Sequence, residues 1–205
     1  LGTMMTMERH QGHFYNWYDT RSLQPLSPLY VSAVDSGNLA GHLMTLRAGF
    51  IGLGNIGKPM ARRIVDAGVP LTVFDVAPAP AAELAAAGAR AVSTAREVAA
   101  ASDVVGVCVR DDAEVRAVVL GDDGIFAGAP AGLVVAIHST VLPRTVREIA
   151  AALASRGVAV VDACVTGGAG GAAQGKLTYM VGGEADLVET CRPVFATSAE
   201  RIVHT

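Results

Sequence analysis

The chain has 205 residues, which is enough for one large domain, or one domain with an appendage, and for a buried core. Its net charge of −3 gives no support for binding to nucleic acid or to an anionic membrane. The cysteines, Cys108, Cys164 and Cys191, are odd in number and widely spaced, so we expect reduced thiols and neither a disulfide framework nor a metal site. No apolar run approaches the roughly 20 residues that span a bilayer. The first residues lack a basic region followed by an apolar one, so we expect no signal peptide. We therefore expect a cytoplasmic protein without a membrane partner.

Residues 1–47 differ in composition from the rest of the chain. They hold five of the ten aromatic residues and three of the five histidines, whereas the residues from Ala48 onward are rich in alanine, valine and glycine. Such a change predicts a domain boundary, but 47 residues containing Pro25 and Pro28 make a poor independent core. We expect residues 1–47 to be a foreign or fused fragment with little structure, and residues 48–205 to form a dinucleotide-binding domain.

A glycine fingerprint opens this second region. The segment Phe50-Ile-Gly-Leu-Gly-Asn-Ile-Gly57 combines a short apolar strand with a G-x-G-x-x-G turn, and a predicted helix follows over 56–67. Such a turn places a diphosphate at the helix N-terminus, where free N–H groups and the helix dipole favour negative charge. Asp75 ends the next apolar run at the spacing of a carboxylate that binds the adenosine ribose. The predicted cofactor contacts here are Gly52, Leu53, Gly54, Asn55, Ile56, Gly57 and Asp75.

Strand-like and helix-like segments then alternate to the end of the chain. Nearly continuous apolar strands separated by helices predict an α/β fold, a doubly wound parallel sheet of the Rossmann type. We predict strands over 50–53, 71–74, 104–109, 133–137, 158–162 and 177–181, and helices over 56–67, 81–87, 95–101, 112–119, 144–155 and 185–195.

Ligands of such sheets bind at the C-terminal ends of the strands. This rule predicts that three segments lie near the cofactor, because each follows a strand: Val109–Asp111, His138–Thr140 and Asp162–Gly171. Nothing positions His138 against a reacting atom, and we interpret it as a packing residue at a strand end.

The last of these segments is a second glycine cluster, Asp162-Ala-Cys-Val-Thr-Gly-Gly-Ala-Gly-Gly-Ala-Ala-Gln-Gly-Lys-Leu177. Consecutive glycines after Thr166 could offer backbone N–H groups and a hydroxyl to an anion such as a substrate carboxylate. They could equally form a flexible connection that needs glycine for its backbone angles. Composition alone leaves both readings open.

Three motifs together resemble the β-hydroxyacid dehydrogenase family. They are the fingerprint Gly52–Ala61, the strand-end pair Ser139-Thr140, and the pattern from Asp162 to Leu177 with Met180-Val-Gly-Gly183. The family includes 3-hydroxyisobutyrate dehydrogenase, tartronate semialdehyde reductase and the cofactor domain of 6-phosphogluconate dehydrogenase, and the resemblance covers about Arg47 to Thr205. It implies a hydroxy acid substrate, homo-oligomeric full-length relatives and NAD(P) as cofactor. The charge of Asp75 would repel the 2′-phosphate of NADP, so we expect NAD rather than NADP. The resemblance further implies nicotinamide contacts at Val109, Arg110 and Thr140, and substrate contacts at Thr166, Gly167 and Gly168.

The chain departs from the family pattern in two residues and one domain. Thr166 stands where serine is usual and Arg110 where proline is common, which leaves the substrate open. The resemblance also implies a catalytic lysine in a C-terminal helical domain. We expect that domain to be absent here, because the chain stops at Thr205, where the domain would begin. The two lysines, Lys58 and Lys176, do not occupy the catalytic position. No catalytic residue is therefore assigned, and we expect the chain alone to be inactive. A non-catalytic nucleotide-binding or interaction module is the alternative.

Within the first region, His13–Thr20 and Tyr30–Leu43 resemble an internal stretch of the cyclic β-1,2-glucan synthases. This resemblance implies a weaker alternative, a fragment of a carbohydrate-active enzyme. A sugar site needs walls from many helices, so we do not expect function from residues 10–43 alone.

Overall fold

A computed structural model describes residues 9–10, 13–14 and 46–205 of the chain. The chain divides into two units, Leu1–Thr45 and Leu46–Thr205. In the first unit, strand β1 (Arg9–His10) pairs antiparallel with β2 (His13–Phe14). The predictions made for the remainder of residues 1–45, including the resemblance of residues 10–43, lie outside the described residues.

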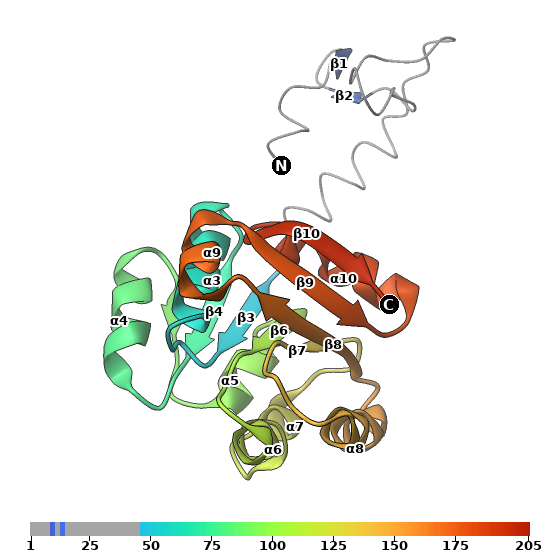
Figure 1. Cartoon of the computed structure of the whole chain (residues 1–205). Helices are drawn as coiled ribbons and strands as arrows, with labels where there is room; N and C mark the ends of the chain where they lie inside the picture. Colours follow the sequence, from blue (N-terminus) through green and yellow to red (C-terminus); the bar gives the residue numbers. More distant parts are fainter. Residues whose placement is uncertain (1–8, 11–12, 15–45) are drawn as a thin grey trace. The chain divides into compact units, whose positions relative to one another are not determined.

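The second unit is built on one eight-stranded sheet (Figure 1). Its strands are β3 (Ala48–Ile51), β4 (Leu71–Phe74), β5 (Arg90–Ala91), β6 (Val104–Val107), β7 (Val134–Ile137), β8 (Ala159–Thr166), β9 (Leu177–Gly182) and β10 (Ala199–His204). They lie in the order β10-β9-β8-β7-β6-β3-β4-β5. The order reverses between β3 and β6, which makes this the point where a doubly wound sheet opens toward ligands.

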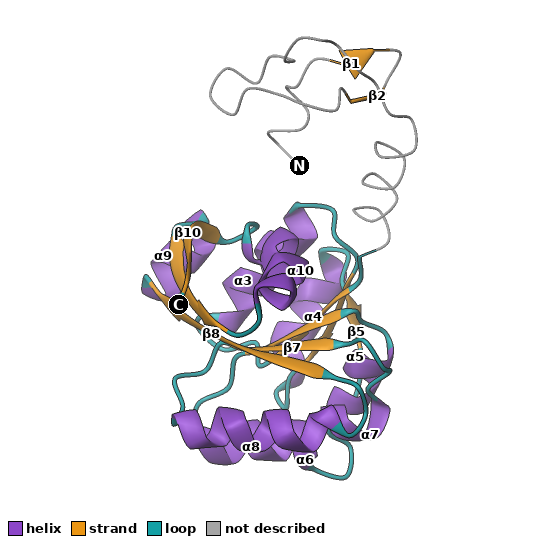
Figure 2. Cartoon of the chain, turned by 90° about the vertical axis from the view of Figure 1, so that its right-hand side faces the viewer, coloured by secondary structure: helices purple, strands orange, loops and turns teal. Residues whose placement is uncertain are grey.

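Helices cover both faces of this sheet (Figure 2). One hydrophobic core lies against α3 (Gly57–Asp66), α4 (Pro78–Ala86), α9 (Gly168–Gln174) and α10 (Ala185–Phe195). The other lies against α5 (Ala95–Ala100), α6 (Asp112–Leu120), α7 (Ile125–Gly128) and α8 (Pro143–Ala154). The central strands are apolar on both sides because both sides are buried: all four residues of β3, of β6 and of β7 are buried. The predicted Rossmann-type fold is confirmed.

The sheet is not parallel throughout, which corrects the prediction in one respect. Strand β9 runs antiparallel to β8, and β10 runs parallel to β9, so the last two strands are reversed relative to the others. The physical reason lies in the connections. Only the ten residues 167–176 join β8 to β9, whereas a parallel crossover needs about a dozen residues or more. The helix α10 supplies such a crossover between β9 and β10.

Strand β8 is also longer than its neighbours. The residues Ile51, Phe74, Val107, Ile137 and Asp162 stand level with one another across five adjacent strands. The other four strands end at this level, but β8 continues to Thr166, paired only with β9. Asp162 therefore lies inside a strand, which corrects the prediction that the segment from Asp162 follows one. The last four residues of β8 extend past the edge where the remaining strands end.

Among residues 46–205 and the two short strands before them, no helix is long and apolar enough to cross a membrane.

Candidate cofactor-binding site

The fingerprint turn between β3 and α3 is shaped by two glycines. Gly52 has φ +88°, and a Cβ at this position would lie 2.3 Å from the carbonyl oxygen of Cys108. A Cβ at Gly57 would lie 1.9 Å from the carbonyl oxygen of Gly52. Both distances are impossible for a real side chain, so these glycines are required by the close approach of the turn to strand β6 and to the helix. Contacts within the protein therefore determine the shape of the turn.

Gly54 differs from the two glycines beside it. It is exposed, and a Cβ there would meet no protein atom within 4 Å. The residue that precedes helix α3, Ile56, offers no side-chain cap, and the first turn of α3 contains no acidic residue. The helix therefore presents uncapped N–H groups beside an open space, which is the arrangement that binds an anion such as a diphosphate. The residues present fit a dinucleotide.

Asp75 follows β4 and ties its loop to the fingerprint turn. Its Oδ2 accepts a hydrogen bond of 2.5 Å from the backbone N–H of Leu53, and its Oδ1 accepts one of 2.7 Å from that of Ala77. The carboxylate is only partly buried. Because an ionised carboxylate has about four lone-pair positions, two remain for hydroxyl donors. Asp75 can therefore hold the turn and accept bonds from a ribose together.

Two further loops leave the sheet beside this turn, after β6 and after β7. The buried Ser139 joins them, because its Oγ accepts a bond of 2.9 Å from the N–H of Val109. Its carbonyl oxygen accepts a hydrogen bond of 3.5 Å from the Cys164 thiol, which links the β7 loop to β8. Thr140 is exposed at the same edge. The structure thus brings the predicted residues Val109 and Thr140 onto neighbouring loops.

Arg110 lies on this edge, but its guanidinium is paired with a residue of α6, the helix that follows it. It pairs with Glu114, four residues onward, and its side chain is 86% exposed. The hydrogen bond with Glu114 raises the pKa of Arg110 and lowers that of Glu114. Within the part of the chain that the structure describes, Arg110 reaches no other predicted cofactor residue through a hydrogen bond or ion pair.

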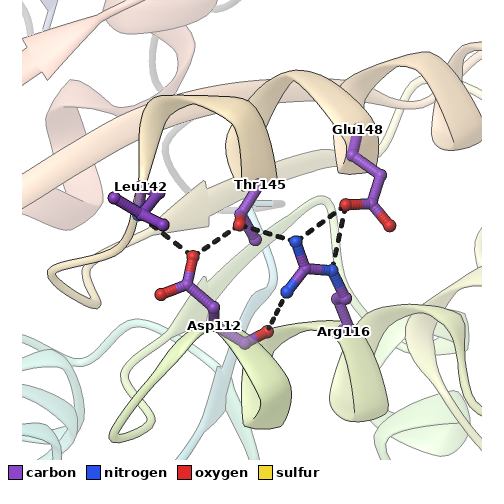
Figure 3. A network of polar contacts seen from close by, with 5 residues as sticks. All are labelled: Asp112, Arg116, Leu142, Thr145 and Glu148. Carbon is purple, nitrogen blue, oxygen red and sulfur yellow. Dashed lines mark hydrogen bonds and ion pairs between the residues drawn. The ribbon is translucent and has the colours of Figure 1, made fainter.

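A polar network joins the N-terminal ends of α6 and α8 (Figure 3). Asp112 Oδ1 accepts bonds from the backbone N–H of Leu142 at 3.0 Å and from the Thr145 hydroxyl at 2.5 Å. Arg116 donates to the Thr145 hydroxyl at 2.9 Å and pairs with Glu148. The hydrogen bond from Thr145 contributes most to lowering the pKa of Asp112, so the Asp112 carboxyl is held ionised. The sequence analysis did not identify this network. The available signal is α8 itself, which starts Leu-Pro-Arg-Thr without a capping side chain.

His138, at the end of β7, is a packing residue. It is 5% exposed and stacks on Phe50, with Tyr179 and Phe195 meeting its edges. Its Nδ1 lies 2.9 Å from the carbonyl oxygen of Ala163, and because a carbonyl can only accept, Nδ1 carries the proton. Burial lowers the pKa of His138 to about 4. It is therefore neutral at physiological pH and faces the core rather than the cofactor edge.

The second glycine cluster forms a helix and its N-terminal turn, rather than a loop throughout. Thr166 ends β8, Gly167 (φ +123°) precedes α9, and Gly168 (φ +62°) begins it. All three are exposed. Because β8 passes the sheet edge before reaching them, they lie beyond the level at which the fingerprint turn begins.

The two lysines have unequal surroundings. Lys58 Nζ, on α3, pairs with Glu83 Oε2 of α4 at 2.8 Å. Lys176 is exposed just before β9, near the second glycine cluster, as its backbone N–H donates to the carbonyl of Gly171. Helix α3 contacts α9 of the glycine cluster, but the Lys58 ammonium is paired with Glu83, and Lys176 lies on no helix. Neither described lysine therefore stands as a general base of the expected kind.

Comparisons with known proteins agree with this geometry. The family model described as the NAD binding domain of 6-phosphogluconate dehydrogenase matches residues 47–205. An NAD-dependent L-serine dehydrogenase of Pseudomonas aeruginosa is 43% identical over 155 residues, covering 76% of this chain and 52% of that protein. A 3-hydroxyisobutyrate dehydrogenase of the same organism is 36% identical over 155 residues, with the same two coverages of 76% and 52%.

A solved structure of Mycobacterium tuberculosis 3-hydroxyisobutyrate dehydrogenase with L-serine is similar in fold. It superposes with a TM-score of 0.73 at 35% identity and covers 78% of this chain and 54% of that one. The chain therefore spans about half the length of the curated relatives it matches.

Proposed function

Because this chain belongs to the β-hydroxyacid dehydrogenase family and carries its NAD-binding domain, we propose that it is the cofactor-binding half of an NAD-dependent dehydrogenase of small 3-hydroxy acids. The observation that carries the proposal is the uncapped N-terminus of α3 beside Gly54, with the Asp75 carboxylate tied to the same turn. These parts match two neighbouring groups of a dinucleotide, its central diphosphate and its adenosine ribose.

The residues that would hold the cofactor divide into three groups. The backbone of residues 52–57 takes the diphosphate, Asp75 takes the ribose hydroxyls, and the loops with Val109, Arg110 and Thr140 lie at the nicotinamide end. Asp75 also sets the choice of cofactor. A carboxylate repels the 2′-phosphate of NADP, and the residues that follow it, Val76-Ala77-Pro78, include no cation that could bind that phosphate. NAD is therefore preferred over NADP.

Bound NAD⁺ supplies the acceptor for the hydride of a substrate alcohol. The contribution of this chain is to hold the hydroxy acid beside it, through the Thr166 hydroxyl and the backbone of Gly167 and Gly168. The reaction also needs a base that takes the alcohol proton, and such a base typically contributes 10²–10⁴-fold to the rate. Lys58 is paired with Glu83, and Lys176 lies on the surface. We propose that the base comes from a helical domain outside these 205 residues, so that the chain alone does not turn over.

The lack of a base among the described residues equally favours a second candidate, a nucleotide-binding module without catalysis. In that case the chain binds NAD but never completes a dehydrogenase site.

A chimera separates the two candidates. The full chain is fused at Thr205 to the C-terminal half of the Pseudomonas aeruginosa 3-hydroxyisobutyrate dehydrogenase, and NAD⁺ reduction is followed with 3-hydroxyisobutyrate and with L-serine. We expect no turnover by the chain alone and NAD-dependent oxidation of at least one acid by the chimera. A folded chimera that binds NADH but oxidises neither acid would favour the non-catalytic module. Turnover by the chain alone at about 1 s⁻¹ or faster, the range of ordinary enzymes, would show that the base lies within it.

A further inference from the structure

The two loops at the nicotinamide end are joined at two separate points. The first is the bond of 2.9 Å from the N–H of Val109 to Ser139 Oγ, next to the strand ends. The second lies three residues farther along both loops, where Asp112 Oδ1 accepts from Leu142 and Thr145 (Figure 3). We call the second set of contacts the Asp112 bridge. Between the two joins lie only Arg110 and Asp111 on one loop and Thr140 and Val141 on the other.

The Asp112 bridge supplies α8 with the N-terminal partner that its own sequence lacks. Leu142 is the residue before the first turn, no side chain of α8 caps its N-terminus, and the first turn holds no acidic residue. Helices α5 and α6 differ, since Thr94 and Asp111 cap them from within their own segments. A carboxylate at a helix N-terminus accepts an otherwise unpaired N–H and interacts favourably with the helix dipole. For α8 that carboxylate comes from a neighbouring helix, so the start of α8 is placed relative to α6.

Burial makes the bridge a defined contact rather than a loose surface pair. Thr145 is fully buried, so its hydroxyl is not exposed to solvent. It donates to Asp112 and accepts from Arg116, so both of its roles are occupied within the network. Arg116 also donates to the carbonyl oxygen of Asp112 at 3.4 Å and pairs with Glu148, so these two residues brace the bridge.

We propose that Asp112 is a positioning residue for cofactor binding, which fixes Thr140 relative to Val109 without touching the cofactor itself. The inference rests on the proposed function, because it assigns these loops to the nicotinamide. Loss of the bridge frees the start of α8 and, with it, the loop from Thr140 to Leu142. The loop then has to be ordered by the cofactor at the expense of affinity.

The test measures NADH affinity of the full chain by calorimetry for wild type, D112A, D112N, T140A and the double variant. Asparagine keeps the Oδ1 acceptor, so we expect about tenfold weaker binding for D112A but a change within about threefold for D112N. If Asp112 acts through Thr140, the two alanine substitutions do not add, and D112A costs less than about twofold in the T140A background.

D103A serves as the matched control. Asp103 also accepts a backbone N–H and a side-chain donor, both from Arg47, but it lies before β6, at the opposite edge of the sheet. We expect D103A to lower the melting temperature while leaving NADH affinity within about twofold. Should D112A fail to fold, T145V removes one of the two contacts to Asp112 without changing the side-chain shape, and we expect about threefold weaker binding.

Three outcomes would overturn the inference. The first is an unchanged NADH affinity in D112A, or in T145V where that variant replaces it. The second is that the effects of D112A and T140A on NADH affinity simply multiply. The third is an equal loss of NADH affinity in D112A and D103A. Each leaves the proposed function intact if the wild-type chain binds NADH. A wild-type chain that does not bind NADH would overturn the proposed function and this inference together.

Discussion

Individual residues at the proposed cofactor site also make contacts that hold the protein backbone. Asp75 was expected to bind a ribose, and it also holds the backbone of Leu53 and Ala77. Ser139 was expected as part of a strand-end motif, and its hydroxyl fixes the N–H of Val109. Sequence spacing identifies such residues because the fold requires them at strand ends. It does not reveal partners far along the chain, which is why the contact of Asp112 with Leu142 was found only in the structure.

His138 gives a pH prediction at the same scale. Its pKa is about 4 in the folded protein, against an ordinary value of 6.5, because burial disfavours the charged form. Above pH 6.5 the ring is neutral in both states and contributes no pH dependence. As the pH falls from 6.5 toward 4, only the unfolded chain takes up the proton, so folding stability decreases. The full difference corresponds to about 3 kcal/mol.

The variant H138N isolates this contribution, since asparagine can donate to the Ala163 carbonyl but does not titrate. We expect H138N to be less stable than wild type at pH 7, because it loses the ring packing. The deficit should shrink by about 2–3 kcal/mol on going to pH 4.5. Urea unfolding of both proteins at the two pH values measures it. A deficit that stays constant would mean that His138 titrates normally in the folded state.

At the scale of elements, the sequence predicts the buried parts of the fold better than its edges. The central strands are recognisable from composition because both of their faces are covered. Strand β10 was missed because it lies at the edge of the sheet, where Glu200, Arg201 and His204 remain exposed among its apolar residues. Helix α9 was missed because four of its seven residues are glycine or glutamine, which gives no helical periodicity. Strand β5, at the other edge, is two residues long and too short for any pattern.

The fingerprint turn yields a prediction that contrasts two of its glycines. A methyl group at Gly54 meets no protein atom, whereas one at Gly57 meets the carbonyl oxygen of Gly52 at 1.9 Å. We expect the free energy of unfolding of G54A to lie within about 1 kcal/mol of the wild-type value. The variant should bind NADH at least tenfold more weakly, because the methyl group occupies the space of the diphosphate. G57A should instead lose several kcal/mol of stability. Thermal melts and NADH titrations of both variants test this. Tight NADH binding by a folded G54A would place the diphosphate elsewhere.

At the scale of the whole molecule, the unit from Leu46 to Thr205 contains what the fold requires. Its sheet has a core on each face, and Leu46 packs against one of them. Arg47 binds Asp103 with its backbone N–H and its guanidinium. The second unit therefore begins at Leu46, two residues before Ala48, where the change in composition had placed the boundary. The residues of the proposed cofactor site all lie within this unit.

Deletion of residues 1–45 should therefore leave NADH affinity unchanged and shift the melting temperature by less than about 4 °C, the scale of 1 kcal/mol in a domain of this size. A melt and a titration of the shortened chain beside the full one provide the comparison. A drop well beyond that range, or weaker NADH binding, would show that the first unit stabilises the second and would refute its description as a foreign fragment.

The most direct test of the account is a calorimetric titration of the full chain with NADH and, separately, with NADPH. The uncapped start of α3 and the open space at Gly54 predict saturable binding of one NADH per chain, and the Asp75 carboxylate predicts weaker binding of NADPH. Tighter binding of NADPH would contradict the role given to Asp75. No saturable binding of either cofactor would contradict the central claim, that this chain is the cofactor-binding half of a dehydrogenase.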